Sequence, residues 1–168
     1  ESPLPFGAPQ FDKIQDEHYL PAFGGGIAEA TAEIDAIVAN EEEPTFENTI
    51  LELEYAGSTL NKVAGIFYNL NEAHTSDRMQ EIAEQISPMM TEYSLSIMLN
   101  GKLFERVKAV YEQRESLTLD QEDKMLLEET YKSFARSGAL LEGEAQEKYR
   151  QYTTELSQLT LEFGQNAL

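Results

Sequence analysis

Apolar residues recur every three or four positions through most of the chain after residue 15, which is the spacing that places side chains on one face of an α-helix. Stretches with this spacing predict about six helices, and none shows the two-residue alternation of a half-buried strand. The predicted helices cover roughly 16–39, 45–70, 76–99, 102–111, 119–137 and 142–168. The pattern therefore predicts an all-α fold, with the helices in an antiparallel, bundle-like array.

The first predicted helix contains three successive glycines, Gly24, Gly25 and Gly26. Each glycine costs a helix about 1 kcal/mol relative to alanine. The apolar stripe nevertheless continues on both sides of the run, at Leu20, Phe23, Ile27, Ala30, Ile34 and Ile37. We therefore expect the helix to persist, and to be bent or packed closely against a neighbour at the glycines.

The second predicted helix has a long and regular stripe, with Thr45 as its expected N-cap. Its members are Phe46, Ile50, Leu53, Gly57, Leu60, Ala64 and Phe67. Because the steps alternate between four and three, the pattern favours two long helices packed antiparallel.

Further start signals precede the later helices. Thr75 or Ser76 is the expected N-cap of the third helix, which Pro88 should kink. Thr118, with Gln121 three residues later, matches a capping box for the fifth helix.

The two ends of the chain carry different patterns. Residues 1–15 include Pro3, Pro5 and Pro9, and predict an extended arm that Phe6, Phe11 and Ile14 could fasten to the helices. The helical domain is expected to occupy 16–168. Its last helix has an apolar stripe at Ala145, Tyr149, Tyr152, Leu156, Leu159 and Phe163, and of these Tyr149 and Tyr152 are expected at the core or its rim. The helix has no stop signal before Leu168, so we expect the chain to be a piece of a longer protein.

Composition excludes several classes of function. The chain has 31 acidic and 12 basic residues, for a net charge of −19, and it has no cysteine. Such a charge repels phosphate backbones, so we expect no nucleic-acid partner. No apolar run approaches the roughly 20 residues of a bilayer span, so we expect no membrane partner. The chain begins at Glu1 rather than Met, so the expected location, cytoplasmic or periplasmic, stays open.

Candidate chemistry is sparse, because the chain has two histidines, His18 and His74. Neither lies in an H-E-x-x-H sequence, which binds zinc through two histidines on one helical face. Capping or packing is the simpler role for both. A mixed carboxylate and imidazole site would require the fold to join Glu17, His18, Glu72 and His74. The chain has so many acidic residues that a glutamate near each histidine is expected by chance. We therefore assign no catalytic and no metal-ligating residue, and the substrate-binding residues are unknown.

One acidic run remains, at residues 41–43 between the first two predicted helices. It lacks the alternating ligands and the loop glycine of a calcium site. A solvated loop is the expected role.

Several motifs, in order along the whole chain, resemble one family. They are Pro5-Phe6-Gly7, Phe11-Asp12-Lys13-Ile14, Glu17 to Phe23, Pro44 to Ile50, Phe67-Tyr68-Asn69-Leu70, Ala73-His74-Thr75, Leu99 to Val107, Arg114 to Leu117, Leu156 to Leu159 and Phe163 to Asn166. Together they resemble the N-terminal region of the thimet-oligopeptidase-like zinc metallopeptidases. The resemblance is greatest to the bacterial peptidyl-dipeptidases, with the oligopeptidases A as close relatives.

The resemblance implies a longer, two-lobed helical peptidase with a zinc site in its C-terminal part. This chain would then form part of the wall of the substrate channel, with no cofactor of its own. The implied partners are the C-terminal catalytic domain of the same polypeptide and short peptide substrates, from which dipeptides are removed at the C-terminus. The alternative from another class is a stand-alone helical adaptor that binds a partner helix.

Overall fold

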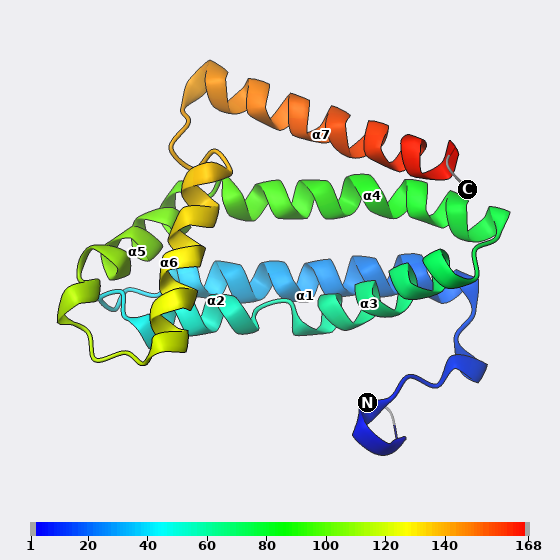
Figure 1. Ribbon diagram of the computed structural model, residues 1–168, viewed down its shortest axis with the longest axis horizontal. Helices are drawn as coiled ribbons and strands as arrows, with labels where there is room; N and C mark the ends of the chain where they lie inside the picture. Colours follow the sequence, from blue (N-terminus) through cyan, green and yellow to red (C-terminus); the bar gives the residue numbers. More distant parts are fainter. Residues whose placement is uncertain (1–2, 167–168) are drawn as a thin grey trace.

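The computed structural model describes residues 3–166, and every regular element in that range is helical (Figure 1). The α-helices are α1 (Tyr19–Ala39), α2 (Glu52–Tyr55), α3 (Ser58–Ala73), α4 (Asp77–Met98), α5 (Gly101–Glu112), α6 (Gln121–Arg136) and α7 (Gly143–Asn166). Single helical turns complete the set: η1 (Pro5–Gly7), η2 (Phe11–Lys13), η3 (Asp16–His18), η4 (Phe46–Leu51) and η5 (Arg114–Ser116). The predicted all-α fold is confirmed.

The long helices α1, α3, α4 and α7 lie along the long axis of the molecule and alternate in direction (Figure 1). α1 packs against α3 and α4, and α7 packs on α4, on the far side from α1. α5 and α6 pack together at one end, where α6 crosses the direction of the long helices. No helix within 3–166 combines the length and the apolar composition needed to cross a bilayer.

Two groups of buried side chains form the core, and α1 contributes to both. The first half of α1 places Tyr19, Phe23 and Ala30 against α3 and α4. Its second half places Ile34 and Ile37 in a separate group with residues of η4, α5 and α6. Because one continuous helix enters both groups, it holds the two ends of the molecule together.

The glycines of α1 have different surroundings. A Cβ atom on Gly24 or Gly25 would meet nothing within 4 Å, whereas one on Gly26 would lie 3.1 Å from the Cα atom of Leu60 on α3. The close packing expected at this run is therefore confirmed at Gly26. Its missing side chain lets the backbones of α1 and α3 approach each other.

The second predicted helix is not continuous, contrary to the expectation from its stripe. The π-helical turn η4 and the short α2 end at Tyr55, and α3 begins at Ser58. Between them Gly57 adopts a left-handed conformation with φ of 75°, which glycine adopts without a steric penalty. Its N–H donates to Oε2 of Glu33 on α1 at 2.7 Å. The break therefore depends on a contact with another helix, which the stripe could not reveal.

Two predicted caps are confirmed and one is wrong. Thr45 accepts a hydrogen bond from the backbone N–H of Asn48 at 3.1 Å, and Ser76, rather than Thr75, accepts one from Met79 at 3.1 Å. The N-cap of α6 is Asp120, which accepts from the N–H of Asp123 at 2.9 Å, so the helix begins after Thr118.

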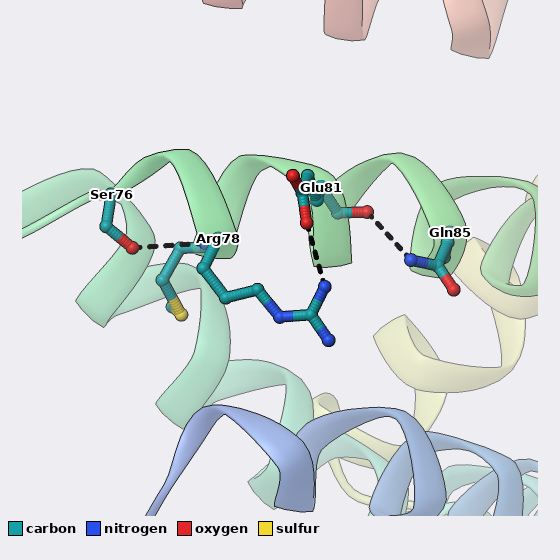
Figure 2. A network of polar contacts seen from close by, with 5 residues as sticks. Ser76, Arg78, Glu81 and Gln85 are labelled. Carbon is teal, nitrogen blue, oxygen red and sulfur yellow. Dashed lines mark hydrogen bonds and ion pairs between the residues drawn. The ribbon is translucent and has the colours of Figure 1, made fainter.

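The first turns of α4 carry a small polar network (Figure 2). Arg78 pairs with Glu81 at 2.8 Å, and the Gln85 side chain donates to the Glu81 carbonyl at 3.3 Å. Because Arg78 and Glu81 are exposed, their ion pair adds little to stability. α4 continues through Pro88 to Met98, so the proline does not end the helix, and its kink stays a prediction.

The arm over 1–15 is less extended than predicted. The turns η1 and η2 interrupt it, and Phe6 and Phe11 are exposed, so neither fastens it to the helices. Ile14 alone of the three packs against the core group of α1, α3 and α4. Residues 1–2 of the predicted arm lie outside the described residues.

The core or rim position expected for two tyrosines of the last helix is confirmed for Tyr149, which is half-buried, and wrong for Tyr152, which is 67% exposed. No described residue of α7 is buried, and most of its apolar stripe faces away from the core. A face rich in serine and threonine packs on α4 instead, through residues such as Thr91 and Ser157. Periodicity alone therefore did not show which face of α7 meets α4, since four members of the stripe are exposed: Tyr152, Leu156, Leu159 and Phe163. The predicted continuation to Leu168 lies outside the described residues.

A matched pair of substitutions tests the close approach of α1 to α3. We expect Gly25→Ala to raise the free energy of unfolding by about 0.5–1 kcal/mol, because alanine favours the helix and has open space there. We expect Gly26→Ala to lower it by about 1–3 kcal/mol, because the new methyl group overpacks against Leu60. Urea unfolding followed by circular dichroism measures both. Equal effects of the two variants would contradict this account of Gly26.

Candidate functional site

The two histidines lie at the ends of different helical elements. Nδ1 of His18 accepts a hydrogen bond from the backbone N–H of Gln15 at 3.2 Å, which caps η3. His74 ends α3, where its backbone N–H donates to the Leu70 carbonyl at 2.8 Å. Nowhere in residues 3–166 are three histidine, aspartate or glutamate side chains placed to hold a metal ion. The fold therefore does not join Glu17, His18, Glu72 and His74 into a site, and these residues do not fit zinc.

The acidic loop over residues 41–43 is held by an arginine from α5. Nη1 of Arg106 donates to the carbonyl oxygens of Asn40 at 2.7 Å and Glu42 at 3.1 Å, and Nη2 donates to Oδ1 of Asn48 at 3.1 Å. The guanidinium thus binds the loop through main-chain and amide oxygens, while the loop carboxylates stay exposed. This agrees with a solvated loop, and nothing in the local sequence marked Arg106 as its partner.

A groove of about 770 Å³ lies between α7 and the neighbouring α3 and α4. Apolar residues on its walls include Tyr68, Ala83, Leu156 and Leu161. Its polar residues carry amide or hydroxyl groups: Asn71, Gln80, Ser87, Thr153, Ser157, Thr160 and Gln165. Glu72 is the charged residue of the lining. Amides and hydroxyls both donate and accept hydrogen bonds, so this lining suits a polar, uncharged chain such as a peptide backbone.

Three hydroxyl groups join α4 and α7 beside the groove. The Oγ atom of Ser157 lies 3.1 Å from Oγ of Ser87 and 2.7 Å from Oγ1 of Thr91. Thr91 also donates to the Ser87 carbonyl at 2.9 Å. The three hydroxyls contact one another and a backbone carbonyl, so their arrangement joins the two helices.

Tyr68 forms part of the wall contributed by α3. Burial raises the pKa of its phenol above the ordinary value of 10.0, because the charged phenolate is poorly solvated there. The side chain therefore stays neutral at physiological pH. It offers the groove an aromatic surface and a hydroxyl group without adding charge.

Sequence reasoning did not identify this groove. One signal was present, since Thr153, Ser157 and Thr160 recur at helical spacing on the polar side of the last predicted helix. That pattern shows which residues share a face, but not that α3 and α4 lie opposite them.

Ser157→Ala tests the hydroxyl cluster, with Thr160→Ala as its control. Both changes place alanine in α7, but the Thr160 hydroxyl donates to the Leu156 carbonyl within the same helix at 2.8 Å. We expect amides of α7 to exchange hydrogen several-fold faster in Ser157→Ala than in Thr160→Ala, since a lost hydrogen bond between helices costs about 1 kcal/mol. Hydrogen–deuterium exchange followed by mass spectrometry measures the difference. Equal exchange in both variants would show that the cluster does not hold α7 on α4.

Comparisons with known proteins place this geometry in context. No protein-family model matches the sequence. The chain is 43% identical over 168 residues to the dipeptidyl carboxypeptidase of Escherichia coli and 40% identical to that of Salmonella typhimurium. Each match covers 100% of this chain and 25% of the relative.

A more distant similarity extends over nearly the same residues. The oligopeptidase A of Salmonella typhimurium is 27% identical over 163 residues, which is 97% of this chain and 24% of that protein. The chain therefore spans about a quarter of the length of the curated relatives that it matches. These matches confirm the resemblance found in the motifs: over its whole length the chain is similar to one region of the dipeptidyl carboxypeptidases and, more distantly, of the oligopeptidases A.

Proposed function

We propose that this chain is the N-terminal, non-catalytic domain of a longer zinc metallopeptidase that cleaves short peptides and releases dipeptides from their C-termini. The observation that carries the proposal is 43% identity to a dipeptidyl carboxypeptidase along all 168 residues, which is a quarter of that enzyme's length. We infer the release of C-terminal dipeptides from the name of that relative, a dipeptidyl carboxypeptidase. We infer the zinc ion from the family of metallopeptidases that the motifs resemble.

In this proposal, the catalytic groups come from residues outside this chain. The described residues contain no group of three ligands placed to hold a metal ion, and the His18 imidazole caps η3. The expected partner is a C-terminal catalytic domain of the same polypeptide. The location of the whole protein, cytoplasmic or periplasmic, belongs to the same proposal.

The domain would form part of the wall of the channel that admits peptides to the catalytic centre. The groove between α7 and the neighbouring α3 and α4 supports this role, because its lining suits an extended peptide backbone. A wall of packed helices would also exclude folded proteins, so that short, unstructured peptides would be the substrates.

A stand-alone helical adaptor is the second candidate. The exposed apolar stripe of α7 favours it, since a helix with such a stripe can bind another helix. An adaptor would need no catalytic partner, so the two candidates differ in the activity of the complete protein.

The test compares the 168-residue chain with the product of the complete reading frame. We expect the complete protein to release C-terminal dipeptides from N-acetylated peptides of about four to eight residues, detected by mass spectrometry. We expect the isolated chain to release none, even with added zinc. A chelator should abolish the activity of the complete protein by removing the metal, and added zinc should restore it.

Denatured and folded forms of one small protein serve as a control for the channel. The complete protein should leave the folded form intact. A reading frame that encodes no H-E-x-x-H sequence, or a complete protein that releases no dipeptide, would contradict the proposed function and favour the adaptor.

A further inference from the structure

Four large apolar side chains form an exposed stripe along α7. Tyr152 is 67% exposed, Leu156 65%, Leu159 54% and Phe163 76%. Their spacing of four, three and four residues repeats the pattern of the apolar positions of a coiled coil, so all four lie on one face. We call these four residues the α7 stripe.

The opposite face of α7 already has a partner. Ser157 contacts Ser87 and Thr91 of α4, Arg150 pairs with Glu92 at 2.8 Å, and the Gln165 side chain donates to Glu84 at 3.2 Å. These contacts are polar, and no described residue of α7 is buried. α7 therefore rests on α4 through a mainly polar face, in which Leu161, alone among the described residues of α7, packs against the core group of α1, α3 and α4. Most of its large apolar side chains stay exposed, with Leu156 at the edge of the groove, which is the reverse of the usual orientation for a surface helix.

We propose that the α7 stripe binds a helix from the rest of the longer polypeptide, and that this helix carries an apolar stripe flanked by lysine or arginine. This inference rests on the proposed function. The relatives that the chain matches are about four times its length, so three quarters of such a protein would be available to supply the partner. The coiled-coil spacing of the stripe selects a helix, because side chains at this spacing fit between those of another helix.

Charge beside the stripe indicates the chemistry of the partner. Glu155 and Glu162 lie next to the stripe, seven residues or about two turns apart, at the heptad position where helix pairs form interhelical ion pairs. The basic residues of α7 are already engaged, since Lys148 pairs with Glu144 at 2.6 Å and Arg150 pairs with Glu92. Basic side chains on the partner would therefore complement this face.

The same charges disfavour a second copy of this chain. Each copy carries a net charge of −19, so two copies repel each other. In an antiparallel pair of α7 helices, Glu155 of one copy would also face Glu162 of the other, and like charges at these positions destabilise a helix pair. A helix with basic flanks avoids both costs.

Thiol labelling tests the proposal, because the 168-residue chain contains no cysteine. Leu159→Cys and Phe163→Cys place single probes in the α7 stripe. Met125→Cys on α6, where the methionine is 61% exposed, is the control. Each variant is prepared both as the 168-residue chain and as the product of the complete reading frame. Labelling at each site is followed by peptide mass spectrometry, and circular dichroism checks that the helix content is unchanged.

The proposal expects both stripe probes to react at least about tenfold more slowly in the complete protein than in the 168-residue chain, while Met125→Cys reacts at similar rates in both. Equal rates for the stripe probes in the two proteins would overturn it. Protection of Met125→Cys to the same degree would also overturn it, because the shielding would not be specific to the stripe. Protection within the 168-residue chain that grows with its concentration would identify a second copy as the occupant, and would overturn it too.

Reversal of the flanking charges tests the basic chemistry of the partner. Lysine near a cysteine speeds labelling by itself, so the rate in the complete protein is divided by the rate in the 168-residue chain. Glu155→Lys with Glu162→Lys, added to Leu159→Cys in both proteins, should raise this ratio several-fold at low salt. An unchanged ratio would overturn the assignment of lysine or arginine to the partner.

Peptidase activity of the complete protein separates this inference from the proposed function. Protection of the stripe without dipeptide release would refute the proposed function and leave the helix contact standing. Dipeptide release with an unprotected stripe would refute the helix contact alone.

Discussion

The close approach of α1 to α3 at Gly26 is the contact on which the rest of the fold depends. α1 enters both groups of buried side chains, so its position relative to α3 fixes where each group forms. Because Gly26 has no side chain, the Cα atom of Leu60 packs directly against the backbone of α1, and the two helices lie close together. Farther along α1, Glu33 then accepts the N–H of Gly57, which fixes the break between α2 and α3. A glycine that weakens an isolated helix thus strengthens the packing of two.

α7 is held on this assembly by a different kind of contact. The core on the α1 side of α4 is apolar, whereas the contact between α4 and α7 is mainly polar: hydroxyl groups, an ion pair and an amide, with Leu161 as the apolar side chain that reaches the core group. Such contacts hold a helix in place with less free energy than apolar burial does. The groove beside Ser157 and the exposed stripe both follow from this arrangement. A partner on the stripe would bury α7 on two sides and make the groove more rigid.

The side chains of the groove are mostly neutral, and they suit the contact with a peptide backbone that we propose. The groove has amides, hydroxyls and an aromatic wall, and burial raises the pKa of Tyr68, whose phenol is already neutral at physiological pH. His18 caps η3, and His74 lies at the end of α3. Arg106 binds the main-chain oxygens of Asn40 and Glu42 at the acidic loop. Similarity to dipeptidyl carboxypeptidases over a quarter of their length agrees with such a division of labour within a longer enzyme.

The sequence by itself determined the helical class, the order of the helices and the caps at Thr45 and Ser76, because these depend on interactions between residues close in the chain. Its ordered motifs also indicated the group of peptidases. The tertiary structure decided which glycine of the run packs closely, where the second predicted helix breaks and which face of α7 meets α4. Each of these depends on a residue distant in sequence, namely Leu60 for Gly26, Glu33 for Gly57 and Ser87 for Ser157. Periodicity identifies the residues that share a face, but only packing decides what lies against that face.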